Sequence, residues 1–151
     1  MEYIFFYSSV VAMIILFLFY LSTRRLKLPY IIIGITTVGF SLINDILLGD
    51  YFNLFYYISP QKSNLYIVLA AVFIYPIVNI AYTMFLPKTS KYTLVYTIFW
   101  IIGMLIFEYF SVLSKAIVFT GWRPIPWSIV LYIIAYLWIY YFYKYLIKKT
   151  I

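Results

Sequence analysis

Residues 3–21 read YIFFYSSVVAMIILFLFYL, an unbroken apolar run of nineteen residues. As an α-helix rising about 1.5 Å per residue, this stretch is long enough to cross a hydrocarbon core of about 30 Å. Glu2 precedes the run, and Arg24, Arg25 and Lys27 follow it. A cleaved signal peptide has positive charge before its apolar stretch, so we expect a retained transmembrane helix that places its own N-terminus outside.

Four further apolar runs follow, each bounded by polar or helix-breaking residues. The predicted spans are residues 30–48, 65–86, 92–111 and 127–145. Residues 50–64 are too polar to span, and we expect an interfacial loop or a short surface helix there. One straight helix over residues 92–119 would measure about 42 Å and overshoot the bilayer. Residues 112–126 are therefore expected to form a surface or partly re-entrant segment.

The composition indicates the same fold class. Apolar residues make up 67% of the 151 residues, and the mean hydropathy is +1.02, well above the values of soluble domains. A chain this short leaves too much of its surface in contact with water to hide that much apolar area in an aqueous core. We predict an all-α, polytopic membrane helical bundle of about five transmembrane helices, forming one domain over residues 1–151.

The basic residues predict the orientation of the bundle. Assigning the loops to alternate sides of the membrane places eight basic residues on one side and three on the other. The eight are Arg24, Arg25, Lys27, Lys88, Lys91, Lys144, Lys148 and Lys149, and the three are Lys62, Lys115 and Arg123. The positive-inside rule then predicts an outer N-terminus and a cytoplasmic C-terminus. Because these residues separate apolar runs and form no patch with interleaved exposed aromatics, nucleic acid is not an expected partner.

The sequence contains neither Cys nor His. This removes thiolate nucleophiles, Cys/His zinc sites and the usual side chain for acid/base work near neutral pH. Walker, Gly-x-Ser-x-Gly and His-Glu-x-x-His motifs are also absent from it. We therefore expect no metal site and no cofactor.

Two carboxylates fall within predicted spans, where a charge near the midplane costs about 2.5 to 3.5 kcal/mol on insertion scales. Asp45 lies close to the outer end of the second span, so it is either a hydrated carboxylate reaching the interface or part of a site. Glu108 lies deeper in the fourth span. Lys115, two helical turns further on, and Arg123 in the outer loop are its predicted ion-pair partners. Such a pair either holds the loop down or belongs to a ligand-binding or proton-handling site.

The second span carries Gly34, Thr37, Ser41 and Asp45 on one small, polar face, with Asn44 beside it. Small residues allow helices to approach closely and hydroxyls bond across them, so helix packing is the first interpretation of this face. Pro76 and Asn79 place a freed backbone carbonyl and an amide side chain near the middle of the third span.

The fifth span has polar-tipped side chains every four residues, which either pack in the core or line a cleft. These are Ser128, Tyr132, Tyr136 and Tyr140. The most specific site hypothesis is an outward-facing cavity that carries both charge signs. Its candidate ligand-binding or ion-handling residues are Asp45, Glu108, Lys115, Arg123, Asn44, Asn79 and Tyr132.

The second half of the chain, from about Asp45 to Tyr145, resembles a family of small uncharacterised multi-spanning membrane proteins of spore-forming Gram-positive bacteria. The resemblance is carried by Tyr75-Pro76, Asn79, Tyr82, Pro87, Lys88, Glu108, Trp122 and Trp127-Ser128. The outer loop departs from it, because Gly121 to Pro126 replace an aromatic-rich stretch. The resemblance implies a bacterial origin and a multi-pass protein of the plasma membrane, and it implies no activity.

Three functions remain open at this stage. The first is a non-catalytic membrane protein that binds a partner helix, a lipid or a small amphiphile through the cavity. Its expected partners are membrane lipids, another membrane protein or further copies of itself. The second is a transporter or channel component moving protons, cations or a small solute, which needs a continuous polar path across the bundle. The third is an enzyme that uses Asp45 and Glu108 as an acid/base pair on a lipid headgroup.

Overall fold

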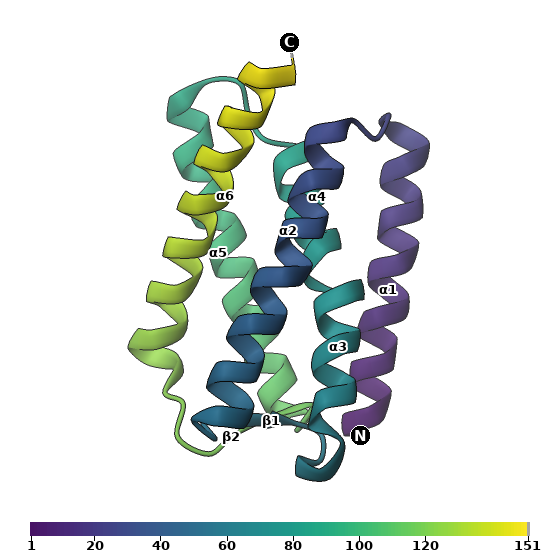
Figure 1. The fold of residues 1–151 in the computed structure, drawn as a ribbon, viewed down its shortest axis with the longest axis vertical. Coiled ribbons are helices and arrows are strands. Elements are labelled where there is room, and N and C mark those ends of the chain that lie inside the picture. The colour runs from purple at the N-terminus through teal and green to yellow at the C-terminus, as the bar shows by residue number, and fades with distance from the viewer. Residues whose placement is uncertain (151) are drawn as a thin grey trace.

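The computed structural model describes residues 1–150 and is a helical bundle (Figure 1). Five helical segments in the described chain are long and apolar enough to cross a membrane. They are Glu2–Thr23, Leu28–Tyr51, Pro60–Met84, Lys91–Leu113 and Pro124–Lys149. This confirms the predicted all-α class and the five spans, each within a few residues of its expected bounds. The two termini lie at opposite ends of the bundle, as an odd number of spans requires.

The helices that make up these spans are α1 (Glu2–Thr23), α2 (Leu28–Asp45), α3 (Ser63–Phe73), α4 (Tyr75–Met84), α5 (Ser90–Leu113) and α6 (Ile129–Thr150). A short π-helical turn, η1 (Ile46–Tyr51), continues α2, and a single 3-10 turn, η2 (Pro60–Lys62), precedes α3. A second π-type turn, η3 (Pro124–Ser128), leads into α6.

The third span is broken into α3 and α4 at Ile74, where the sequence predicts a continuous helix. Pro76 lies in the first turn of α4, and a proline ring has no N–H and clashes with the carbonyl four residues earlier. The helix therefore ends before the proline and restarts, which places Tyr75 at the beginning of α4.

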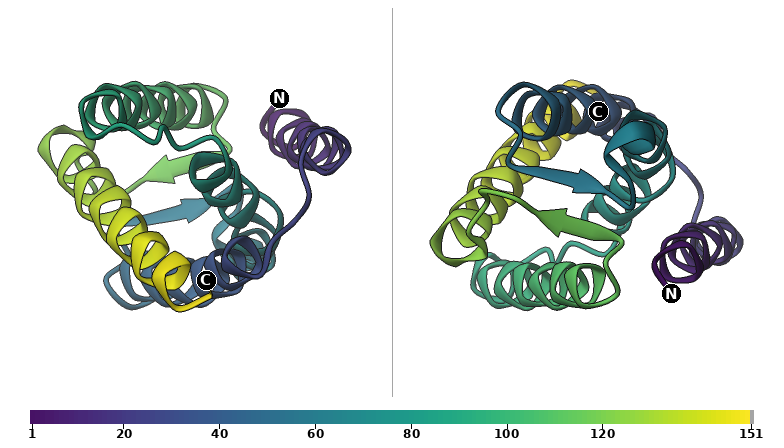
Figure 2. Two further views of the ribbon diagram at one scale, coloured as in Figure 1. Left: turned by 90° about the horizontal axis from the view of Figure 1, so that it is seen from above. Right: turned by 90° about the horizontal axis from the view of Figure 1, so that it is seen from below.

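Seen along its long axis, the bundle is a ring with one helix outside it (Figure 2). Helices α2, α4, α5 and α6 surround the centre, whereas α1 packs against the outer side of α3 and α4. At one end of α1, the ring of Phe6 lies 5.2 Å from that of Tyr66. At the other end, Arg24 Nη1 donates a hydrogen bond of 2.8 Å to the carbonyl of Met84, at the C-terminus of α4.

Two short strands form an antiparallel pair that the sequence does not predict. Strand β1 (Phe55–Tyr57) lies in the expected interfacial loop, and β2 (Ile117–Phe119) lies in the segment expected to be surface or re-entrant. Tyr56 pairs with Val118. The pairing satisfies backbone N–H and C=O groups that have no helical partner. In Figure 2 the strands lie across one end of the ring, which we call the sheet end.

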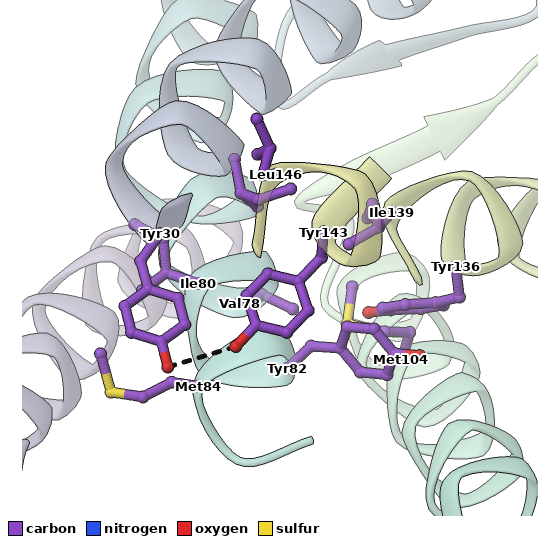
Figure 3. Packing of buried hydrophobic residues seen from close by; sticks show 11 residues of the cluster. Tyr30, Val78, Ile80, Tyr82, Met84, Met104, Tyr136, Ile139, Tyr143 and Leu146 are labelled. Atoms are coloured by element: carbon purple, nitrogen blue, oxygen red, sulfur yellow. Dashed lines mark hydrogen bonds between the residues drawn. The ribbon is translucent and has the colours of Figure 1, made fainter. Parts of the chain in front are cut away.

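The opposite half of the bundle is filled with apolar and aromatic side chains (Figure 3). The buried cluster consists of Tyr30, Ile33, Val78, Ile80, Tyr82, Met84, Met104, Tyr136, Ile139, Tyr143 and Leu146. The rings of Tyr30 and Tyr143 stack at 5.8 Å and their hydroxyls bond at 3.3 Å, while the rings of Tyr82 and Tyr136 lie 4.8 Å apart. We call this half the basic end, because the eight basic residues assigned to one side lie in or next to its two loops and in the last two turns of α6.

Candidate functional site

A cavity of about 460 Å³ lies inside the ring, between the buried cluster and the sheet. Helices α2, α4, α5 and α6 form its walls, and side chains of β1 and β2 line its end. Its volume falls in the range of about 300 to 1,000 Å³ that is typical of small-molecule sites. The wall is mostly apolar and aromatic, with a few polar groups pointing into it.

Asp45 is one of these polar groups and is bonded to Tyr57, which is bonded in turn to Tyr75. Tyr57, on β1, donates from its hydroxyl to Asp45 Oδ2 at 3.0 Å, and the hydroxyls of Tyr57 and Tyr75 lie 2.6 Å apart. A phenol has one hydrogen, so the Tyr57 hydrogen given to Asp45 leaves Tyr75 to donate to Tyr57. Burial raises the pKa of the Tyr57 phenol well above its usual value, and the Asp45 carboxylate raises it further. The phenol therefore stays protonated as a donor.

Glu108 is held by donors from the segment around the start of α6. Ser128 Oγ donates to Glu108 Oε1 at 2.5 Å, and the Tyr132 hydroxyl donates to Oε2 at 2.8 Å. Trp122 Nε1 donates in turn to Ser128 Oγ at 2.9 Å. An indole N–H can only donate, so the serine hydrogen is free for Glu108 and the direction of the chain is fixed. Both oxygens of Glu108 accept hydrogen bonds from neutral groups.

The structure brings five of the seven candidate residues to the cavity. Asn44, Asp45, Asn79, Glu108 and Tyr132 all line it. Asn79 also donates from Nδ2 to Thr37 Oγ1 at 3.2 Å, which joins α4 to α2. On the predicted face of α2, Gly34 packs against α4, where an added Cβ would lie 2.9 Å from Ile80 Cδ1, whereas the Asp45 end of the face borders the cavity.

Lys115 and Arg123 are exposed and do not line the cavity, contrary to the sequence analysis. Helix α5 ends at Leu113, and Lys115 adopts a φ of +62°, which turns the chain away before a second helical turn is completed. The predicted ion pair is therefore replaced by hydroxyl partners. The charged groups of the cavity wall carry one sign, where the sequence analysis expected both.

The site also includes residues whose role the sequence did not reveal. Tyr57 falls in the stretch expected to be an interfacial loop or surface helix, yet it is 3% exposed and bonds to Asp45. Trp122 was assigned to a loop, yet its backbone N–H bonds to the Leu54 carbonyl at 3.0 Å and its indole orients Ser128. For Ser128 and Tyr132, the sequence feature that indicates a role is the spacing of polar-tipped side chains every four residues in the fifth span.

The cavity opens sideways, between α2 and α6. Among its described lining residues the exposed ones are Phe40, Asn44 and Ile134, all on these two helices; Phe40 is 48% exposed and Ile134 is 60% exposed. The rings of Phe40 and Trp138 lie 4.7 Å apart and close the gap toward the basic end. The opening is therefore bordered mainly by apolar side chains.

No protein-family model, curated protein or solved structure matches this chain. The resemblance to the small membrane proteins of spore-forming bacteria therefore stays a prediction, and the function is argued from the site.

Proposed function

We propose that this chain is a non-catalytic integral membrane protein of the plasma membrane that binds a lipid or small amphiphile in the cavity. The observation that carries the proposal is the form of the cavity. It is of ligand size, has carboxylates held in fixed orientation, and has its exposed lining side chains between two helices that face lipid. An apolar tail fits such an opening, and a polar head fits the carboxylates inside.

Binding is favoured over transport by the packing of the basic end. A transported ion or solute needs a polar path from the cavity past Asn79 to the opposite side. The cluster around Tyr30, Tyr82 and Tyr143 fills that half of the bundle instead. Transport is the alternative proposal, and proton flux into vesicles that is lost in Asp45→Asn would support it. The headgroup enzyme is the weakest of the three, because each carboxylate is occupied by structural hydroxyl donors.

The distribution of basic residues predicts on which side of the membrane the cavity lies. The sheet end carries the three basic residues assigned to the outer side, and the cavity lies next to it. Under the positive-inside rule, the cavity lies in the outer half of the bilayer. We infer that its amphiphile comes from the outer leaflet.

Native mass spectrometry of the purified protein tests the proposal. The probe is a mixture of twelve-carbon amphiphiles with cationic, neutral and anionic heads. Ala135 lines the cavity and Ala12 lies exposed on α1, so Ala135→Phe fills the site and Ala12→Phe is the matched control. We expect the wild type and Ala12→Phe to retain at least one amphiphile that Ala135→Phe loses. If the two variants retain the same amphiphiles, the cavity is not their binding site and the proposal is wrong.

A further inference from the structure

The titratable groups of opposite possible sign are unequally represented in the cavity wall, because its two carboxyl groups face no basic side chain among the described residues. Asp45 and Glu108 are the charged groups among its described lining residues, and the wall contains no Lys or Arg. Lys115 and Arg123, the basic residues of the neighbouring loop, are exposed and lie outside the wall. Charged groups inside a membrane protein are normally paired with one another or with a group of opposite sign. None of the described residues supplies such a group to the cavity.

The hydrogen bonds at these two acids orient them and bring no positive charge to them. Tyr57, Ser128 and Tyr132 are neutral donors. Donors of this kind orient a carboxyl group but supply no opposite charge. A cation bound beside these acids would supply that charge and form charge-assisted hydrogen bonds.

The rest of the wall suits a cation with an apolar body. Aromatic rings adjoin the carboxylates, because Tyr75 belongs to the Asp45 chain and Trp122 and Tyr132 belong to the Glu108 chain. The face of an aromatic ring attracts an ammonium group, most strongly where water is excluded. Beyond them, Phe40 and Ile134 are the exposed apolar side chains at the opening to the lipid side, and Trp138 packs against Phe40 at its edge.

We propose that the ligand is a cationic amphiphile, with an ammonium head between Asp45 and Glu108 and an apolar chain leaving between α2 and α6. This inference rests on the proposed function and adds the charge of the head and the path of the tail. It predicts discrimination between amphiphiles that differ only in the head, since a neutral or anionic head gains nothing from two carboxylates.

Quenching of tryptophan fluorescence by a bromine-labelled chain measures this discrimination. The protein is placed in nanodiscs of neutral lipid and titrated with 12-bromododecylammonium or with 12-bromododecanol. Trp138 lies at the passage, so its quenching reports occupancy, and Trp138→Phe identifies the signal that comes from it. We expect the ammonium to bind at least about tenfold more tightly than the alcohol, which corresponds to about 1.4 kcal/mol.

Isosteric variants assign the preference to the carboxylates. Asp45→Asn and Glu108→Gln keep the side-chain shape and remove one charge each, and we expect each to weaken ammonium binding about tenfold. Asp50→Asn is the matched control, because Asp50 is an exposed acid on η1 outside the cavity wall. The comparison of the two heads on the wild type needs no variant, so a variant that fails to fold does not remove the test.

The outcomes separate the two proposals. Equal binding of ammonium and alcohol, with both lost in Ala135→Phe, would overturn the cationic ligand and leave the proposed function standing. If neither chain quenches Trp138 above the level of Trp138→Phe, both proposals are overturned. A preference for the ammonium that persists unchanged in both isosteric variants would place the cation elsewhere and also overturn this inference.

Discussion

Tyr57→Phe removes one hydroxyl from a loop residue between two spans, and we expect it to destabilise the bundle more than most loop substitutions do. The Tyr57 hydroxyl is the middle member of the chain from Tyr75 to Asp45, so the substitution breaks both hydrogen bonds at once. A hydrogen bond to a charged group contributes about 1.5 to 3 kcal/mol. A neutral side-chain hydrogen bond in a membrane protein contributes about 0.6 kcal/mol. The expected loss in the free energy of unfolding is therefore about 2 to 3.5 kcal/mol.

The assay is reversible unfolding of the purified protein in bicelles, with Tyr56→Phe as the matched control. Tyr56 is the preceding residue on β1, and successive side chains on a strand point to opposite faces. Its substitution should change the free energy of unfolding by less than about 0.5 kcal/mol. A double-mutant cycle with Asp45→Asn should give a coupling energy of about 0.5 to 3 kcal/mol, as for residues in direct contact. Equal effects of Tyr57→Phe and Tyr56→Phe would refute the reasoning, because they would show that the hydroxyl chain contributes nothing.

Three further predictions follow from the same geometry. Gly34→Leu should lower the free energy of unfolding, measured in the same bicelles, by about 1 to 3 kcal/mol through overpacking against α4. Gly39→Leu is the control and should not lower it, because a Cβ added at Gly39 would have no atom within 4 Å. The stability advantage of the wild type over Tyr57→Phe should be full below pH 10 and decline as the pH rises above it. The reason is that burial raises the pKa of this phenol in the folded state above its value in the unfolded state. As the pH rises, the phenol ionises in the unfolded state before it does so in the folded state, which favours unfolding. Cysteines replacing Tyr56 and Val118, which lie opposite each other, should form a disulfide on mild oxidation, seen as a gel shift, while a pair one residue out of register should not. If the cavity fills from the lipid side, locking the sheet in this way should leave the rate of amphiphile binding unchanged.

The helices could be predicted from the sequence because the length of an apolar run is a local property. Residues 3–21 are long enough to span whatever the rest of the chain does, and the same holds for the other four runs. The break at Ile74 was missed although Pro76 was noted, because a proline in a membrane helix either kinks it or ends it, and tertiary packing decides which.

The strands could not be predicted, because each has three residues and its partner lies about sixty residues away in the sequence. A run of that length shows no period of two, and its pairing depends on contacts that no local pattern contains. The error at Lys115 has a related cause. Its distance from Glu108 places it on the same helix face only if the helix continues, and α5 ends two residues before it.

The position of the sheet explains why the two carboxylates face one cavity. Asp45 receives its hydrogen bond from Tyr57 on β1, and Glu108 receives one through Trp122, which follows β2. The backbone N–H of Trp122 is bonded to the carbonyl of Leu54, immediately before β1. The donor to Asp45 thus lies on the sheet, and the indole that orients the Ser128 donor of Glu108 is anchored beside it. By pairing with each other, the two loops satisfy backbone groups and also fix Tyr57 and Trp122 relative to one another. The geometry of the site therefore depends on the loops as well as on the helices, and substitutions that break the strand pair should disturb both carboxylates together.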